Sequence, residues 1–242
     1  MNRIIRILAV VAVSAGFTFS VQAAELVVVA STAPDYKVGM VVDADDPFHV
    51  GPGTEVTLIS SAGLPVKLVG PFDGVPELSG KNGKTGLAAA LSDVIMASQQ
   101  KTSSAGIMRA ALFDSGDPWV IDSGRSGSYC IAGGKPVMFW RAITIGEVQA
   151  SLKSGGQRAQ IVWAAGNSKA EWPQDFPLNG GETYRLEFTT TKKVRDYTIH
   201  RVPEGLETDA HKVVWMHAKG CGKQASILLT RLQETVKTPD QG

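Results

Sequence analysis

Cys221 and His217 are the pair of side chains in this sequence best suited to nucleophilic chemistry. They lie in the stretch WMHAKGCGKQASILLTRL, residues 215–232, where Cys221 follows His217 by four positions. Residues i and i+4 share one face of an α-helix, where an imidazole could activate a thiolate. Gly220 stands between them, however, and glycine is the residue that most often ends a helix. A thiol-dependent enzyme built on this pair is therefore an alternative interpretation.

Two Asp-Ser-Gly tripeptides offer serine as a second nucleophile, at Ser115 and Ser123. The first, FDSGDP, resembles in part the nucleophile loop of trypsin-like serine proteases, which needs glycines around this tripeptide so that backbone amides can bind the oxyanion. Phe113 and Asp117 replace two of those glycines, and the only preceding histidine is His49. The motif favours a polar turn, with a serine hydrolase as a further form of the enzyme alternative.

Cofactor and metal motifs are incomplete. The segment LSGKNGKTG, residues 78–86, contains the Gly-Lys-Thr of a phosphate-binding loop, but Leu78 occupies the position where that loop requires its first glycine. No group of cysteines and histidines has the spacing of zinc ligands. We therefore predict no cofactor, no metal and no assembled catalytic residues.

Among the five tryptophans, Trp172 is the one we expect to be exposed. It lies in AEWPQDFP, a polar, proline-containing segment between two predicted strands, where an indole ring could contact a ligand. Trp172 is thus a possible contact residue, and glycan binding is a second alternative function.

The N-terminus has the pattern of a secretory signal peptide. Arg3 and Arg6 precede an apolar run, and Val21-Gln22-Ala23 provides small residues for cleavage after Ala23. No later segment is apolar enough to cross a bilayer. The sequence predicts a periplasmic or secreted protein, with signal peptide 1–23 and no stable membrane insertion after cleavage.

The charge balance argues against nucleic acid as a partner. Removing Arg3 and Arg6 leaves 22 basic against 23 acidic residues, a formal net charge of −1. Such a balance gives no general attraction to polyanions. A hydrophobic content of 43% argues against general disorder.

Export changes the interpretation of the cysteines. An exported chain with two cysteines most simply pairs them, which predicts a Cys130–Cys221 disulfide. Closing a loop of about 91 residues would stabilise the fold by roughly 4–5 kcal/mol in the chain-entropy treatment.

The remaining chain predicts a mainly β protein with a helical C-terminus. Short apolar strands separated by Gly-Pro turns indicate a small antiparallel β module over residues 24–69. Residues 70–116 have the composition of a linker, with a helix at about 86–99. Residues 117–238 predict a β-sandwich-like domain, in which Tyr184, Leu186 and Phe188 face inward, closed by two C-terminal helices.

Cys221 is expected at the start of the second of these helices. Thr208 is the predicted N-cap of the first helix, and Gly220 provides the positive φ at its end. Cys221 then shares an apolar stripe with Ala225 and Leu228, which favours a structural role for this cysteine.

Residues 49–74, HVGPGTEVTLISSAGLPVKLVGPFDG, resemble the small β modules of bacterial envelope proteins, including the FecR-type domain. The ending WM-x-x-x-G-C-x-x-Q-A, residues 215–225, is similar to that of uncharacterised secreted proteobacterial proteins. The resemblance implies an envelope location and brings no activity with it. Because the sequence predicts two β surfaces and no assembled catalytic residues, we expect an exported, non-catalytic interaction module whose partner is an envelope protein or a cell-wall component.

Overall fold

The computed structural model describes residues 24–78, 86–102, 115–206 and 208–237. The predicted signal peptide, residues 1–23, lies outside the described residues, as do residues 79–85 of the loop that resembles a phosphate-binding motif. Strands and helices follow one another as β1 (Glu25–Ser31), β2 (Val41–Asp43), β3 (Phe48–Val50), β4 (Glu55–Ser60), β5 (Pro65–Val69), β6 (Phe72–Gly74), α1 (Leu87–Thr102), β7 (Val120–Asp122), β8 (Gly127–Ile131), β9 (Met138–Trp140), β10 (Val148–Ser154), β11 (Gln157–Trp163), β12 (Lys169–Glu171), β13 (Thr183–Phe188), β14 (Val194–Arg201), α3 (Asp209–Ala218) and α4 (Gly222–Lys237). The prediction of a mainly β fold with paired C-terminal helices is confirmed.

The N-terminal sheet has the antiparallel strand order β2-β1-β4-β5. Strand β1 contains a continuous apolar run, and its residues from Leu26 to Val29 are fully buried. Alternate side chains of a strand point to opposite faces, so an unbroken run of this kind requires cover on both faces. Leu26 and Val28 pack in a small core with β3 and its neighbours, whereas Val27 and Val29 pack against the helices.

The C-terminal domain is a sandwich of two sheets. A sheet of order β11-β10-β13-β14-β8 faces a smaller one of order β12-β9-β7. Tyr184 and Leu186 are fully buried in the core between the sheets and Phe188 packs against it, which confirms the predicted alternation. Arg185 and Glu187 point outward into cross-strand ion pairs with Asp196 and Lys153.

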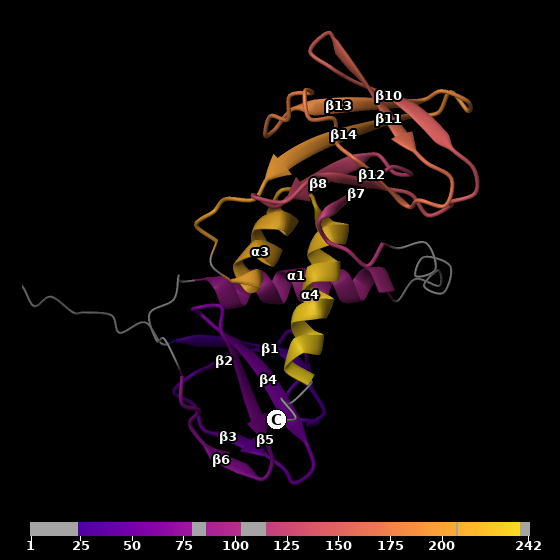
Figure 1. Ribbon diagram of the computed structural model, residues 1–242. Helices are drawn as coiled ribbons and strands as arrows, with labels where there is room; N and C mark the ends of the chain where they lie inside the picture. The colour runs from indigo at the N-terminus through magenta and orange to yellow at the C-terminus, as the bar shows by residue number, and fades with distance from the viewer. Residues whose placement is uncertain (1–23, 79–85, 103–114, 207, 238–242) are drawn as a thin grey trace, which may run out of the picture.

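Three helices form a layer between the two β regions (Figure 1). Helix α1, which agrees with the helix predicted at about 86–99, buries an apolar stripe that includes Leu87, Leu91 and Ile95. Helices α3 and α4 pack together and contribute to the same core, which also receives Val27 and Val29 of β1 and Cys130 of β8. This helix core therefore touches both β regions.

Local signals explain where α3 begins and ends. The Thr208 side chain caps the helix by accepting a hydrogen bond from the His211 N–H, as predicted. After the helix, Gly220 has φ +79°, and the Cys221 N–H donates to the Met216 carbonyl. This tight turn places Cys221 directly before α4.

Among the described residues, no helix is long and apolar enough to span a membrane.

Candidate functional site

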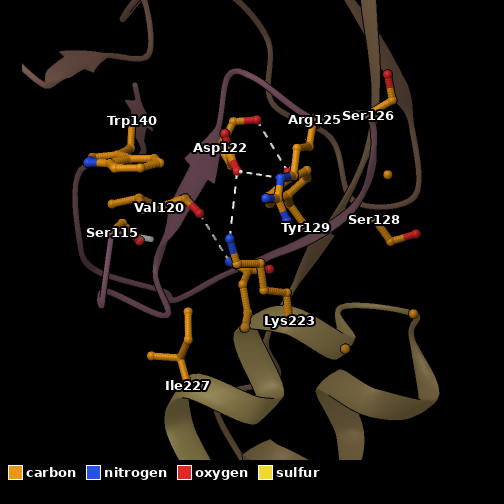
Figure 2. A pocket seen from close by; sticks show the side chains of 14 residues that line it. Ser115, Val120, Asp122, Arg125, Ser126, Ser128, Tyr129, Trp140, Lys223 and Ile227 are labelled. Carbon is orange, nitrogen blue, oxygen red and sulfur yellow. Dashed lines mark hydrogen bonds and ion pairs between the residues drawn. The ribbon is translucent and has the colours of Figure 1, made fainter. Parts of the chain in front are cut away.

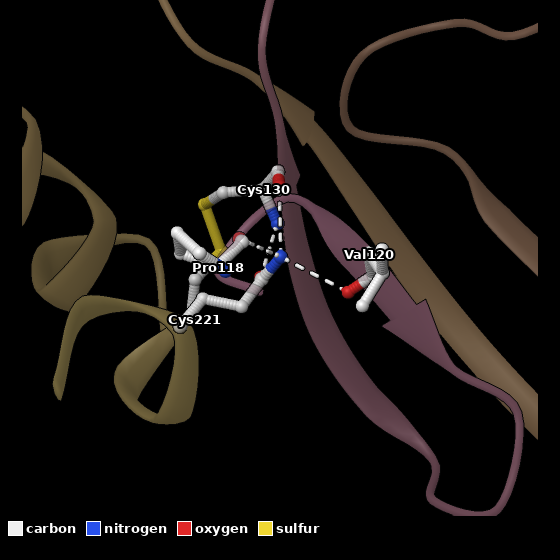
Figure 3. The surroundings of a disulfide bond; sticks show 5 residues. Pro118, Val120, Cys130 and Cys221 are labelled. Atoms are coloured by element: carbon white, nitrogen blue, oxygen red, sulfur yellow. Dashed lines mark hydrogen bonds between the residues drawn. A yellow bond between two sulfur atoms is a disulfide. The ribbon is translucent and has the colours of Figure 1, made fainter. Parts of the chain in front are cut away.

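Cys130 and Cys221 form a disulfide that joins β8 to the start of α4 (Figure 3). Both cysteines are buried, at 0% and 1% exposed. The sulfur of Cys221 is bonded, so this structure offers no thiolate for His217 to activate. A buried disulfide indicates that the chain folds in an oxidising compartment.

Gln224 reinforces this junction with a buried side-chain amide that sequence reasoning missed. Its Oε1 accepts the Cys130 N–H at 2.7 Å, and its Nε2 donates to the carbonyl oxygens of Cys130 and Pro118 at 2.9 and 2.7 Å. These bonds pair the amide with the backbone of β8 and with the segment that leads into β7. The sequence marks this residue only as a polar position beside the buried face of an amphipathic helix.

The two candidate serines occupy different environments. Ser115 hydrogen-bonds to the backbone of Asp117 in a local turn, which agrees with the polar turn favoured by the sequence. Ser123 is buried at 2% exposure, its backbone N–H bonded to the Trp140 carbonyl. Phe113 and Asp114, the first two residues of the segment FDSGDP, lie outside the described residues.

The expected exposure of Trp172 is wrong. Trp172 is only 6% exposed, stacks on Phe139 with ring centroids 5.4 Å apart, and meets Tyr184 edge to face at 4.9 Å. Its indole N–H donates to the Phe176 carbonyl at 3.0 Å, which satisfies the one polar atom of the ring. Distant aromatic residues, rather than the polar neighbours in sequence, decide its burial.

A pocket of about 200 Å³ lies where the sandwich meets α4; we call it the junction pocket (Figure 2). It is bounded by β7, the β7–β8 turn, β8, the last residue of β9, and the first two turns of α4. Its lining residues are Ser115, Val120, Asp122, Arg125, Ser126, Gly127, Ser128, Tyr129, Trp140, Gly220, Gly222, Lys223, Gln224 and Ile227. Among its described lining residues there is no histidine and no cysteine, so none of them offers a pocket serine an imidazole base.

Asp122 is the acidic residue of the junction pocket, and its side chain is only 14% exposed. One carboxylate oxygen accepts the Gly124 N–H at 2.9 Å. The other lies 3.6 Å from Arg125 Nε and 3.8 Å from Lys223 Nζ, both longer than a good hydrogen bond. Asp122 is therefore flanked by two cationic side chains, one from the β7–β8 turn and one from the first turn of α4.

Tyr129 forms part of the wall of the pocket. Burial, together with the neighbouring Asp122 carboxylate, raises the pKa of its phenol far above the ordinary value. The hydroxyl therefore keeps its proton and lies within hydrogen-bonding distance of the Asp122 and Arg125 carbonyl oxygens, at 3.2 and 3.0 Å. This contact fixes the turn that carries Arg125.

Residues 141–147 form a second distinctive surface, which we call the apolar loop. Ile143 and Ile145 are 64% and 89% exposed. Arg141, 7% exposed, donates hydrogen bonds to the carbonyl oxygens of Thr144, Gly146, Ala164 and Asn167 at 2.8–3.4 Å. One arginine thus holds this loop and the neighbouring loop after β11 in a fixed shape.

The polar groups near the apolar loop are linked to one another. Glu147 accepts from the Gln149 amide at 2.7 Å, and the Gln149 oxygen accepts from Gln160 at 2.9 Å.

In the described part of the chain, no group of three or more His, Cys, Asp or Glu residues could hold a metal ion. Comparisons with protein-family models, curated protein sequences and solved structures found no match.

Proposed function

We propose that this protein is an exported, non-catalytic interaction module of the bacterial cell envelope, located in the periplasm or outside the cell. The predicted signal peptide and the buried Cys130–Cys221 disulfide support this location. The resemblance of residues 49–74 to envelope β modules agrees with it.

The observation that carries the proposal is the display of Ile143 and Ile145 on a braced loop. Transfer of large aliphatic side chains from water into an apolar pocket lowers the free energy, which favours binding. A loop that is already ordered also loses little conformational entropy when it binds. The four carbonyl groups bonded to Arg141 also need no new partner when water is removed. The apolar loop is therefore suited to insertion into a dry pocket.

A protein pocket suits this loop better than a lipid surface. Glu147 is exposed, whereas the only basic residue of the loop, Arg141, is buried. Anionic lipids attract exposed lysine and arginine, which these seven residues do not provide. An apolar centre beside the Glu147–Gln149–Gln160 hydrogen bonds instead has the composition of a small protein–protein contact, with a polar rim.

Site-specific photo-crosslinking in cells that express the full-length precursor tests this proposal. A photoreactive residue at position 145 is expected to form one discrete protein adduct. The matched control is position 69, where Val69 is 59% exposed on β5 of the N-terminal sheet and should give no such adduct. The double substitution Ile143→Ser/Ile145→Ser should lower recovery of that partner by at least about tenfold, the range expected for central contact residues.

Three results would contradict the proposal. Equal amounts of adduct at positions 145 and 69 would indicate that crosslinking reports nonspecific collisions. The absence of any adduct at position 145 would show that the apolar loop is not a protein-binding surface. An adduct to lipid would replace the protein partner with a membrane surface.

A further inference from the structure

Strand β11 forms one edge of the five-stranded sheet, and its seven residues contain no proline. It pairs with β10 over its whole length, from Val148↔Trp163 to Ser154↔Gln157, without a shift of register. The other edge strands among the described residues have five residues or fewer. A long, regular edge of this kind is a template on which a further strand can pair.

The β10–β11 turn fixes which backbone groups of β11 face this edge. Residues 155–156 are glycines with φ 54° and 80°, and such a two-residue turn brings Ser154 and Gln157 into a hydrogen-bonded pair. Bonded pairs then alternate along the two strands. Gln149 supports this phase, because its carbonyl faces away from β11 and accepts the Thr189 N–H, which follows β13. The even-numbered residues of β11 therefore direct their N–H and C=O groups away from β10.

Three exposed residues, Arg158, Gln160 and Val162, thus present six backbone hydrogen-bonding groups to the open edge. Within the described part of the chain, no other residue bonds to these groups. The opposite edge of the same sheet is closed, since Gln224 bonds to both the N–H and the carbonyl oxygen of Cys130 on β8. The chain therefore covers one edge of this sheet itself and leaves the other open.

The side chains of β11 identify a second copy of this chain as the strand that fits. In an antiparallel pair centred on Gln160, Arg158 of one copy lies opposite Val162 of the other, and Gln160 lies opposite its own counterpart. The arginine stem can then cover a valine that is 46% exposed, and the two glutamine amides can exchange hydrogen bonds. The two Arg158 positions are about 14 Å apart along the strands, beyond the Debye length of about 8 Å. A parallel pair would instead place these like charges side by side.

We propose that the β11 edges of two copies pair antiparallel about a twofold axis at Gln160, which joins two five-stranded sheets into one continuous sheet. The six edge groups of each copy then bond to those of the other. Each copy uses the same surface, so the contact closes at a dimer. The edge contains neither Ile143 nor Ile145, so the outcome for this dimer does not decide the proposed function.

Sedimentation equilibrium of the mature protein tests the dimer. A single strand pair is a small contact, so we expect a reversible dimer that forms at about 0.1 mM protein. Gln160→Lys and Gln160→Glu each place two like charges opposite each other at the axis and should raise the dissociation constant at least about tenfold. An equimolar mixture of the two variants should restore association to within about threefold of the wild type, which a folding defect would not allow. Val194→Lys is the matched control, because Val194 is 41% exposed on the same face but lies on β14, an inner strand of the sheet.

Single cysteine substitutions test the register. Under mild oxidation with diamide, Gln160→Cys should crosslink two copies, because Cα atoms of a bonded antiparallel pair lie about 5.5 Å apart, within the range of a disulfide. Arg158→Cys and Val162→Cys are matched controls whose counterparts lie about 14 Å away, and neither should crosslink.

Several results would overturn the proposal. Crosslinking at all three positions would indicate a parallel pair, and crosslinking at 158 or 162 alone would indicate a different register. A wild-type protein that stays monomeric at about 1 mM, where even weak dimers are populated, would remove the contact. Open-ended oligomers, or a mixture of the Lys and Glu variants that does not associate, would contradict the twofold pairing.

Discussion

Strand β1 of the N-terminal sheet is buried on both faces, whereas the sandwich strands are buried mainly on the face that meets the opposite sheet. The sandwich makes its core from its own two sheets, all within residues 120–201. The N-terminal sheet makes a small core on one face and takes the cover of its other face from α1, α3 and α4. One β region is thus self-contained, and the other depends on helices that the chain contributes up to about 200 residues later.

Helix α4 shows this dependence most directly. Its first residues are fixed to β8 by the disulfide and by Gln224, and near its other end Gln233 donates to the Val29 carbonyl at 2.7 Å. In Figure 1, α4 runs from the sandwich toward the N-terminal sheet. The sandwich therefore positions α4, one of the helices that cover the N-terminal sheet, through the disulfide and Gln224.

The largest expected effect comes from Cys130→Ala/Cys221→Ala. Removing the bridge should lower the free energy of unfolding by roughly 4–5 kcal/mol, because the loop that it closes spans 91 residues. Hydrogen exchange should show α3, α4 and β1 losing protection before β10 and β13. Loss of protection in the sandwich core first would contradict the division into dependent and self-contained regions.

Gln224→Met should have the next largest effect. Methionine keeps the length of the side chain but leaves the Cys130 N–H and the Pro118 carbonyl without their buried partner. We expect a loss of about 2–4 kcal/mol in urea unfolding, with the disulfide intact. Lys223→Met, at the adjacent partly exposed position, is the control and should change stability by well under 1 kcal/mol.

Gly63→Ala sharpens the comparison from the side of the N-terminal sheet. Gly63 has φ +77° in the β4–β5 turn, and an added Cβ would collide with Thr208 Oγ1, the cap of α3, and lie 2.9 Å from His211 Nδ1. We expect a loss of about 1–3 kcal/mol, measured by thermal unfolding. Gly53→Ala, which also has a positive φ but open space around it, separates backbone strain from the contact with α3. Equal losses in both variants would show that the contact contributes nothing.

The smallest effect concerns Asp117, which binds Lys169 inside the sandwich half of the molecule. Burial opposes ionisation of this carboxyl, but hydrogen bonds from Lys169 and the Trp119 N–H outweigh it and hold its pKa below the ordinary 3.8. The ionised Asp117 carboxylate therefore stabilises the folded state fully above pH 3.8, the ordinary pKa of the unfolded chain. This contribution is lost as the pH falls through the lower pKa that Asp117 has in the folded state. Asp117→Asn should cost under about 1 kcal/mol at pH 7, since the pair is partly exposed. The difference from wild type should close below pH 3.8, with no change in exchange at β1.

An even number of cysteines and a predicted signal peptide were enough to predict the disulfide, and period-two alternation was enough to orient Tyr184 and Leu186. These are local or compositional signals. The Thr208 cap and the Gly220 turn belong to the same class, because each depends on a few adjacent residues.

The missed features all depend on contacts between distant segments. Trp172 has polar neighbours in sequence, but Phe139 and Tyr184 bury it from other strands. Arg141 resembles any charged residue at the end of a strand until the loop after β11 surrounds it. The junction pocket likewise joins Asp122 to Lys223, about 100 residues apart, through the turn that the disulfide fixes.

The Cys130–Cys221 bridge also determines how the molecule would carry tension if its two ends were pulled apart. Force entering β8 would cross directly into α4 and bypass the intervening chain, which contains β9 to β14 and α3. Those 91 positions correspond to about 300 Å of extended chain that an intact bridge withholds. The strands from β9 to β14, with the apolar loop, would then bear no tension, whereas the chain on either side of the bridge, which includes β7 and α4, would carry it.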